Sequence, residues 1–182
     1  TFGTLALTGV NVAVTENAAT DLGASTVSGT LGITSAGAVT DSGTLAITGA
    51  TTISASGQDI TLDESASTFG SLLLTGANVA VTDAGAVDLG ASTISGTLGI
   101  TSAGAVTDSG TLAITGATTI SASGQDITLD ESASTFGTLA LTGANVAVTD
   151  AGAVDLGAST VSGTLGITSA GAVTDSGTLA IT

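Results

Sequence analysis

The chain repeats itself every 67 residues, and this repeat limits the folds that it can adopt. The triplet TFG stands at residues 1, 68 and 135, and the segment GTLAITGATTISASGQDITLDESAS occurs unchanged at residues 43–67 and 110–134. The first two copies differ at eight positions, and the third stops after 48 residues. Near-copies in tandem pack on their neighbours in the same way each time. We therefore expect residues 1–182 to form one continuous solenoid with repeats 1–67, 68–134 and 135–182 (incomplete).

Within each repeat, apolar and small polar residues alternate between glycines. In TLAIT (residues 44–48) the alternation places Leu45 and Ile47 on one face and Thr44, Ala46 and Thr48 on the other. A period of two with many β-branched residues predicts strands. Helices are disfavoured because Gly, Ser and Thr are dense and no 3.6-residue apolar stripe is present.

The spacing predicts an all-β fold, a parallel β-helix. We count roughly nine strands per repeat, so three strands per rung (one full circuit of the chain) give three rungs of about 22 residues. With rungs about 4.8 Å apart, 182 residues give about eight rungs and a rod roughly 40 Å long. Phe69 and Phe136 are then expected to align three rungs apart, and removing one repeat shortens the rod by about 14 Å. A β-roll or another solenoid, and an antiparallel sandwich, are the alternatives.

Charge excludes several functions. The 15 carboxylates face no Lys, Arg or His, which gives a formal charge of −15. Nucleic-acid binding and anionic membranes are excluded because both need cationic side chains. We expect no membrane-embedded segment, since Thr, Ser or Gly interrupts every apolar run. The absence of Cys rules out disulfides and is compatible with a secreted bacterial chain.

Four elements of residues 78–132 resemble the repeat regions of large bacterial exoproteins. These elements are DLGAST, AGAVTDSGTL, GATTISA and DITLD. The exoproteins in question are the filamentous-haemagglutinin-type adhesins of two-partner secretion. The resemblance implies a right-handed parallel β-helix, bacterial-type secretion to the cell surface or the extracellular space, and a role as an adhesive or spacing stalk. The family's secretion domain has no counterpart in these residues, and none of its receptor-binding residues can be carried over.

Catalysis is not expected. Only carboxylates are present among the usual catalytic groups, as the adjacent pairs Asp63–Glu64 and Asp130–Glu131. Neighbouring residues of a regular strand point to opposite faces, so such a pair would not flank one bond. We interpret these pairs as solvated charges at corners and predict that the protein is not an enzyme and uses no cofactor.

The sequence offers candidates for three kinds of binding site. Asp83, Asp88, Asp108 and Asp126 stand apart in sequence, so we expect loosely held Ca²⁺ as a counter-ion rather than a specific metal site. Ice binding needs threonines on one flat face, but GTL motifs spaced 26, 14 and 27 residues apart would scatter pairs such as Thr44 and Thr48, or Thr111 and Thr115. Asn11, Asn78 and Asn145 each precede a strand, and we expect hydrogen bonds at a corner or inside the coil rather than ligand contacts.

We predict a structural protein, a segment of a secreted or surface-anchored β-helix that forms a stalk or extracellular fibre shaft. The uniform character of the array is expected of an excerpt from a longer repetitive protein. Copies could associate end to end or laterally in a filament, because rungs at the ends expose strand edges. The alternative is an adhesin module that binds a surface or a glycan, with ice binding as a weaker third hypothesis.

Overall fold

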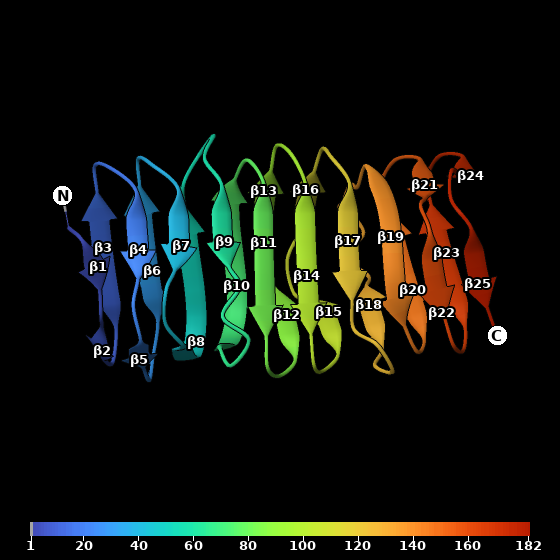
Figure 1. The fold of residues 1–182 in the computed structure, drawn as a ribbon. Coiled ribbons are helices and arrows are strands. Elements are labelled where there is room, and N and C mark those ends of the chain that lie inside the picture. Colours follow the sequence, from blue (N-terminus) through green and yellow to red (C-terminus); the bar gives the residue numbers. More distant parts are fainter. Residues whose placement is uncertain (1) are drawn as a thin grey trace.

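Two long parallel β-sheets form the protein, and the chain passes between them in every rung of a solenoid (Figure 1). The computed structural model describes residues 2–182. No helix occurs within that range, and all paired strands are parallel. As the chain advances from left to right in Figure 1, near strands such as β11 (Val79–Asp83) and β14 (Leu98–Ser102) run downward, so the coil is right-handed. The prediction of a parallel β-helix is confirmed.

Most of the strands are short, and most recur in the same places in each repeat. The first repeat contains β1 (Thr4–Leu5), β2 (Thr8–Gly9), β3 (Val12–Glu16), β4 (Thr20–Leu22), β5 (Ser25–Val27), β6 (Leu31–Ser35), β7 (Val39–Asp41), β8 (Leu45–Ser54) and β9 (Ile60–Leu62). The second contains β10 (Thr68–Gly76), β11, β12 (Val87–Leu89), β13 (Ser92–Ile94), β14, β15 (Val106–Asp108), β16 (Leu112–Ile114), β17 (Thr118–Ser121) and β18 (Ile127–Leu129). The third contains β19 (Thr138–Gly143), β20 (Val146–Asp150), β21 (Val154–Leu156), β22 (Ser159–Val161), β23 (Leu165–Ser169), β24 (Val173–Asp175) and β25 (Leu179–Ile181).

One repeat makes three and a half rungs, not three. Strands β4, β12 and β21 hold equivalent residues of the three repeats; β4 and β21 lie in the 12-stranded sheet, whereas β12 lies in the 13-stranded sheet. Seven steps separate β4 from β21 along the sheet, and 134 residues separate them along the chain, so a rung has about 19 residues. Most equivalent strands of successive repeats, such as β3 and β11 or β4 and β12, therefore lie in opposite sheets, although β5 and β13 share the 13-stranded sheet.

The prediction of 22 residues per rung and about eight rungs was wrong, and the lengths of strands and bends explain why. The rung from Val12 to Thr30 holds strands of five, three and three residues joined by bends of three, two and three residues. A rung of 22 residues needs about seven residues for each strand with its bend, which is more than these segments have. The solenoid has about nine rungs and a length of about 45 Å at the usual strand spacing. Phe69 and Phe136 are buried but, one repeat apart, lie half a rung out of register rather than three rungs apart.

The interior is a continuous aliphatic core. Leu45 and Ile47 are 0% and 2% exposed while Ala46 between them is exposed, which confirms the predicted inside and outside of TLAIT. Side chains of the same kind stack along the axis, as Ile33 pairs with Ile53 in the next rung. Each rung therefore buries its apolar face mainly against its neighbours and the opposite sheet.

Two threonines interrupt this core. Thr51 pairs with Leu31 on one side and Leu72 on the other, and Thr118 occupies the equivalent place in the second repeat. Both residues are 0% exposed, and their Oγ1 atoms have no hydrogen-bond partner. They are buried polar groups that the fold leaves unsatisfied, which costs stability.

Candidate functional surface

The acidic pairs that sequence analysis considered for catalysis lie in loops after β9 and β18. The backbone N–H groups of Asp63 and Glu64 donate to the two carboxylate oxygens of Asp41, one rung earlier, at 2.9 and 3.4 Å. Asp108 accepts in the same way from the Asp130 and Glu131 N–H groups at 2.8 and 3.4 Å. Residues 2–182 enclose no pocket that could hold a substrate beside either pair. Each pair thus belongs to a loop that is fastened by a carboxylate of the preceding rung.

The role of Asp41 and Asp108 in fastening these loops was not predicted from the sequence. Both side chains are nearly buried at the ends of β7 and β15. Burial raises the pKa of each carboxyl above its ordinary value, although the two backbone donors oppose this rise. The recurrent separation of 22 residues between VTD and the first residue of the acidic pair was the available signal, but its meaning depends on the rung length.

A second set of carboxylates closes the bends after β3, β11 and β20. Asp83 accepts hydrogen bonds from the N–H groups of Phe69 and Gly85 at 3.0 and 2.6 Å. Asp150 binds the Phe136 N–H at 2.9 Å, and Glu16 binds the Phe2 N–H at 2.6 Å. These acids hold the segment that begins with the phenylalanine against the next rung. Burial raises the pKa of Asp83, whereas the Phe2 N–H chiefly lowers the pKa of Glu16.

A third set points outward and gathers hydroxyl groups. Asp21 accepts from the Oγ1 of Thr4 at 2.6 Å and the Oγ of Ser42 at 2.8 Å, and these donors lie in the rungs on either side. Asp88 binds the Oγ of Ser109 at 2.7 Å, and Asp155 binds the Oγ of Ser176 at 2.6 Å. Hydroxyl donors lower the pKa of Asp21 and Asp155. In a chain with no cationic side chain, hydroxyl and amide groups are the only side-chain partners that a carboxylate finds.

The two directions of pKa shift have opposite effects on stability. Where the folded pKa is raised, as for Asp41, Asp83 and Asp108, the fold disfavours the ionised form, so stability increases as the pH falls through the folded pKa. Where it is lowered, as for Glu16 and Asp21, stability is present above the ordinary values of 4.5 and 3.8 and is lost as the pH falls through the folded pKa. The raised pKa values therefore favour stability in mild acid, and the lowered ones oppose it in stronger acid.

Asparagines link successive rungs at the corners of the coil. The backbone N–H and the Nδ2 of Asn78 both donate to Oδ1 of Asp59, at 3.1 and 2.9 Å. The Oδ1 of Asn78 then accepts from the N–H and the Oγ1 of Thr97 at 3.1 Å each. Asn145 and Asn11 also accept from the threonine one rung later. The expected corner hydrogen bonds of these asparagines are confirmed.

The residues considered for Ca²⁺ and for ice have different surroundings. Asp83 and Asp108 fasten neighbouring segments, Asp88 binds hydroxyl groups, and Asp126 binds Asn145. Within residues 2–182 no group of three or more His, Cys, Asp or Glu could hold a metal ion. Thr44, Thr48, Thr111 and Thr115 are exposed, and the first pair is related to the second by one repeat, which is three and a half rungs. Ala46 inside the first pair is stacked between Thr26 and Thr68, whereas Ala113 inside the second pair stacks on Thr93, so the two pairs belong to different columns of the surface.

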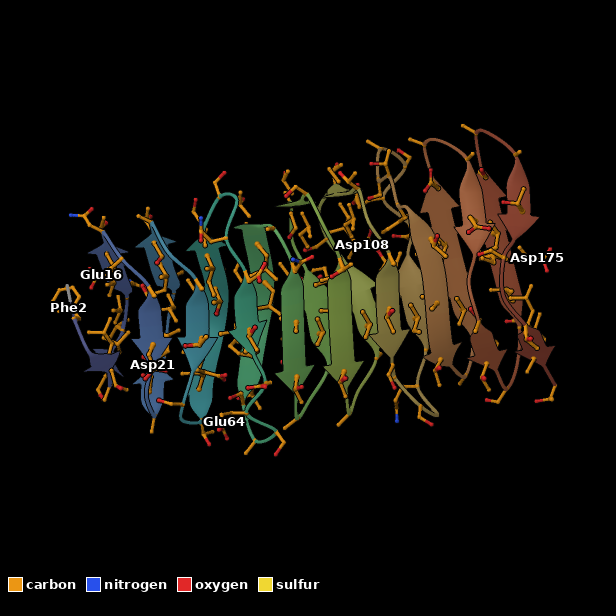
Figure 2. The ribbon with its side chains drawn as sticks, turned by 45° about the horizontal axis from the view of Figure 1, so that its top comes forward. Phe2, Glu16, Asp21, Glu64, Asp108 and Asp175 are labelled. Atoms are coloured by element: carbon orange, nitrogen blue, oxygen red, sulfur yellow. The ribbon has the colours of Figure 1, made fainter. Side chains whose placement is uncertain are left out.

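Carboxylates and uncharged residues occupy separate blocks of the surface. The first acidic block lies along β4, β7 and β9 and their bends, and the second lies along β12, β15 and β18. Asp155 on β21 and Asp175 on β24 begin a third. On the surface the first acidic block presents Asp21, Asp59, Asp63 and Glu64, and the second presents Asp88, Asp126, Asp130 and Glu131; Asp41 and Asp108 lie nearly buried beneath them. Figure 2 shows Asp21 and Glu64 in the lower part of the molecule and Asp108 towards its upper edge.

Neutral blocks lie between the acidic ones. The first neutral block is formed by outward residues of β3, β6, β8 and β10, namely Ala13, Thr15, Gly32, Thr34, Thr52, Ser54, Leu73 and Thr75. The second is formed by β11, β14, β17 and β19 and consists of Ala80, Thr82, Gly99, Thr101, Thr119, Ser121, Ala140 and Thr142. Because repeats alternate between sheets, an acidic block on one side always has a neutral block directly behind it.

The fold and its surface define a class of protein, a parallel β-solenoid built from tandem repeats. The chain belongs to the family described as Repeats of unknown function (DUF5649), whose model matches residues 9–75, 76–142 and 143–182. The full matches have the same 67-residue length as the sequence period, with boundaries eight residues after each TFG. The match supports a repeat protein and does not extend to adhesins of the filamentous-haemagglutinin type. No curated protein and no solved structure matches the chain.

Proposed function

We propose that this chain is a structural shaft, a segment of a secreted or surface-anchored β-solenoid whose length is set by the number of repeats. The observation that carries the proposal is that parallel strand pairing continues across each repeat boundary. Strands β9 and β11 belong to different repeats, yet they pair in the same parallel manner as strands within a repeat. The same holds for β18 and β20 at the next boundary.

The surface supports a shaft in preference to a catalytic or a ligand-binding module. The chain has no Lys, Arg, His, Tyr or Trp, so it lacks the side chains that usually anchor glycans, phosphates or peptides. None of the described residues forms a helix long and apolar enough to cross a membrane. What each repeat does provide is a further three and a half rungs with the same core.

An insertion series tests the shaft. Duplicating residues 68–134 should lengthen the rod by about 17 Å, three and a half rungs at the strand spacing, without changing its cross-section. Small-angle X-ray scattering would measure both quantities. As a matched control, duplicating only residues 68–100 adds no whole repeat, and it should disturb the stack and lower the melting temperature. A duplicated repeat that increases the cross-section instead of the length would refute the proposal.

Export is tested separately, on the native cells. An antibody raised against residues 1–182 should label intact cells or recover the protein from the medium. Labelling that requires permeabilised cells would refute the extracellular part of the proposal and would leave the shaft itself standing.

A further inference from the structure

We propose that neighbouring copies of this chain associate side by side, with the neutral blocks of one rod against the acidic blocks of the next. The inference rests on the proposed shaft and adds a partner to it, namely a second copy of the chain in the same orientation and at the same height. It comes from the separation of charged and uncharged surface described above.

The arrangement of charge decides which contacts between copies are tolerable. If two rods met through the same sheet at the same height, acidic blocks would face acidic blocks, and no Lys or Arg is available to neutralise them. If instead the front of one rod meets the back of the next, every acidic block meets a neutral block. The half-integral number of rungs per repeat produces this match at every height.

The neutral blocks present hydroxyl groups that can donate hydrogen bonds to the carboxylates of an acidic block. Thr101 and Thr119 are exposed, and Thr82 and Ser121 are partly exposed, so the second neutral block presents a group of hydroxyl donors. Within the chain the same chemistry is already in use, because Thr and Ser hydroxyls donate to Asp88 across neighbouring rungs. Hydrogen bonds to an ionised acceptor are stronger than those between neutral groups.

The area available explains how such an association would depend on length. One side of the rod measures about 45 by 17 Å, or about 750 Å², from the strand spacing and a strand of five residues. This is close to the roughly 800 Å² per partner of an ordinary specific interface, but it is polar and contains few large side chains. Two copies of 182 residues should therefore associate weakly, and arrays with more repeats should associate far more tightly because their blocks act together.

Single cysteines can test the orientation, because the chain has none of its own. Thr119 is exposed in the second neutral block and Thr107 is exposed in the second acidic block, on the opposite sheet at a similar height. Under mild oxidation a mixture of Thr119→Cys and Thr107→Cys should form a mixed disulfide several-fold faster than either variant alone. Ser56→Cys, in the exposed bend that joins β8 to β9 at the edge between the two sheets, gives the rate for random collision.

A charge substitution gives a second readout that does not depend on cysteine. Thr119→Glu places a carboxylate where an acidic block of the next copy should lie, so it should abolish the concentration-dependent increase in sedimentation coefficient. Ser56→Glu has the same net charge and should retain that increase. Equal loss in both variants would indicate general repulsion and would overturn the inference.

The outcomes separate this inference from the shaft. Rods of the expected length that never form the mixed disulfide above the Ser56→Cys rate would overturn side-by-side association but not the shaft. Faster self-crosslinking of Thr119→Cys than of the mixture would show neutral blocks facing each other, which also overturns it. A compact particle in scattering would refute the shaft, and the inference with it.

Discussion

Replacing the buried threonines Thr51 and Thr118 with valine should make the protein more stable. Each hydroxyl is fully buried with no partner, and valine has nearly the same shape without the polar atom. An unsatisfied buried hydroxyl costs about 1–3 kcal/mol, so each Thr→Val substitution should stabilise the fold by about 1–2 kcal/mol. The two sites are one repeat apart and share no partner, so their effects should add.

Thermal unfolding followed by circular dichroism measures this effect. For a chain of this size, 1 kcal/mol shifts the midpoint by about 2–4 °C, so the double variant should melt roughly 4–16 °C higher than the original. Thr51→Ser is the matched control, because it keeps the hydroxyl, removes a buried methyl group and should lower the midpoint. Thr20→Val is a second control, since Oγ1 of Thr20 does have a partner, the Oγ of Ser35 at 3.0 Å. Destabilisation by Thr51→Val would show that its hydroxyl is satisfied and that our reading of the core is wrong.

Three further predictions concern the core, a bend and acidity. In urea titrations Leu45→Asp should lower the free energy of unfolding by about 3 kcal/mol or more, whereas Thr44→Ser should hardly change it. The reverse order would mean that the inward and outward faces of this strand have been exchanged. Gly57→Ala should lower stability by about 1 kcal/mol, because Gly57 has a φ of +73° that alanine disfavours. The control Gly3→Ala, where no atom lies near the added methyl group, should change stability little. Equal effects of the two substitutions would contradict an origin in the backbone conformation of Gly57. The urea midpoint should rise from pH 7 into mild acid, because buried carboxyls such as Asp41 have raised pKa values, and fall in stronger acid, because that of Asp21 is lowered. A steady decline from pH 7 downward would refute the sign that we derived.

Much of the fold could be predicted from the sequence because alternation and repetition are local signals. The faces of Leu45 and Ile47 and the parallel coil followed from them directly. The rung length could not be predicted in the same way, because it depends on where a strand continues through a corner. Strand β8 continues from Leu45 to Ser54 through Gly49, a residue that the pattern suggested as a break.

The surface was harder to predict than the core. Which carboxylates meet which neighbours depends on register, and steps between paired residues range from 17, for Thr4 and Asp21, to 22, for Ala46 and Thr68. An error of three residues per rung moves an acidic residue to a different side after a few rungs. The loop-fastening carboxylate of Asp41 and the alternating blocks were therefore beyond what spacing alone could show.

Because one repeat spans three and a half rungs, it matters whether the number of added repeats is odd or even. Each added unit turns whatever follows it by half a revolution about the rod, so a domain carried beyond an odd number of extra units faces the side opposite to its original one. Two added units restore its direction and only increase its reach. Gain or loss of one unit by recombination between the near-identical copies would thus reverse the aim of the distal part, while the packing of every rung stayed the same.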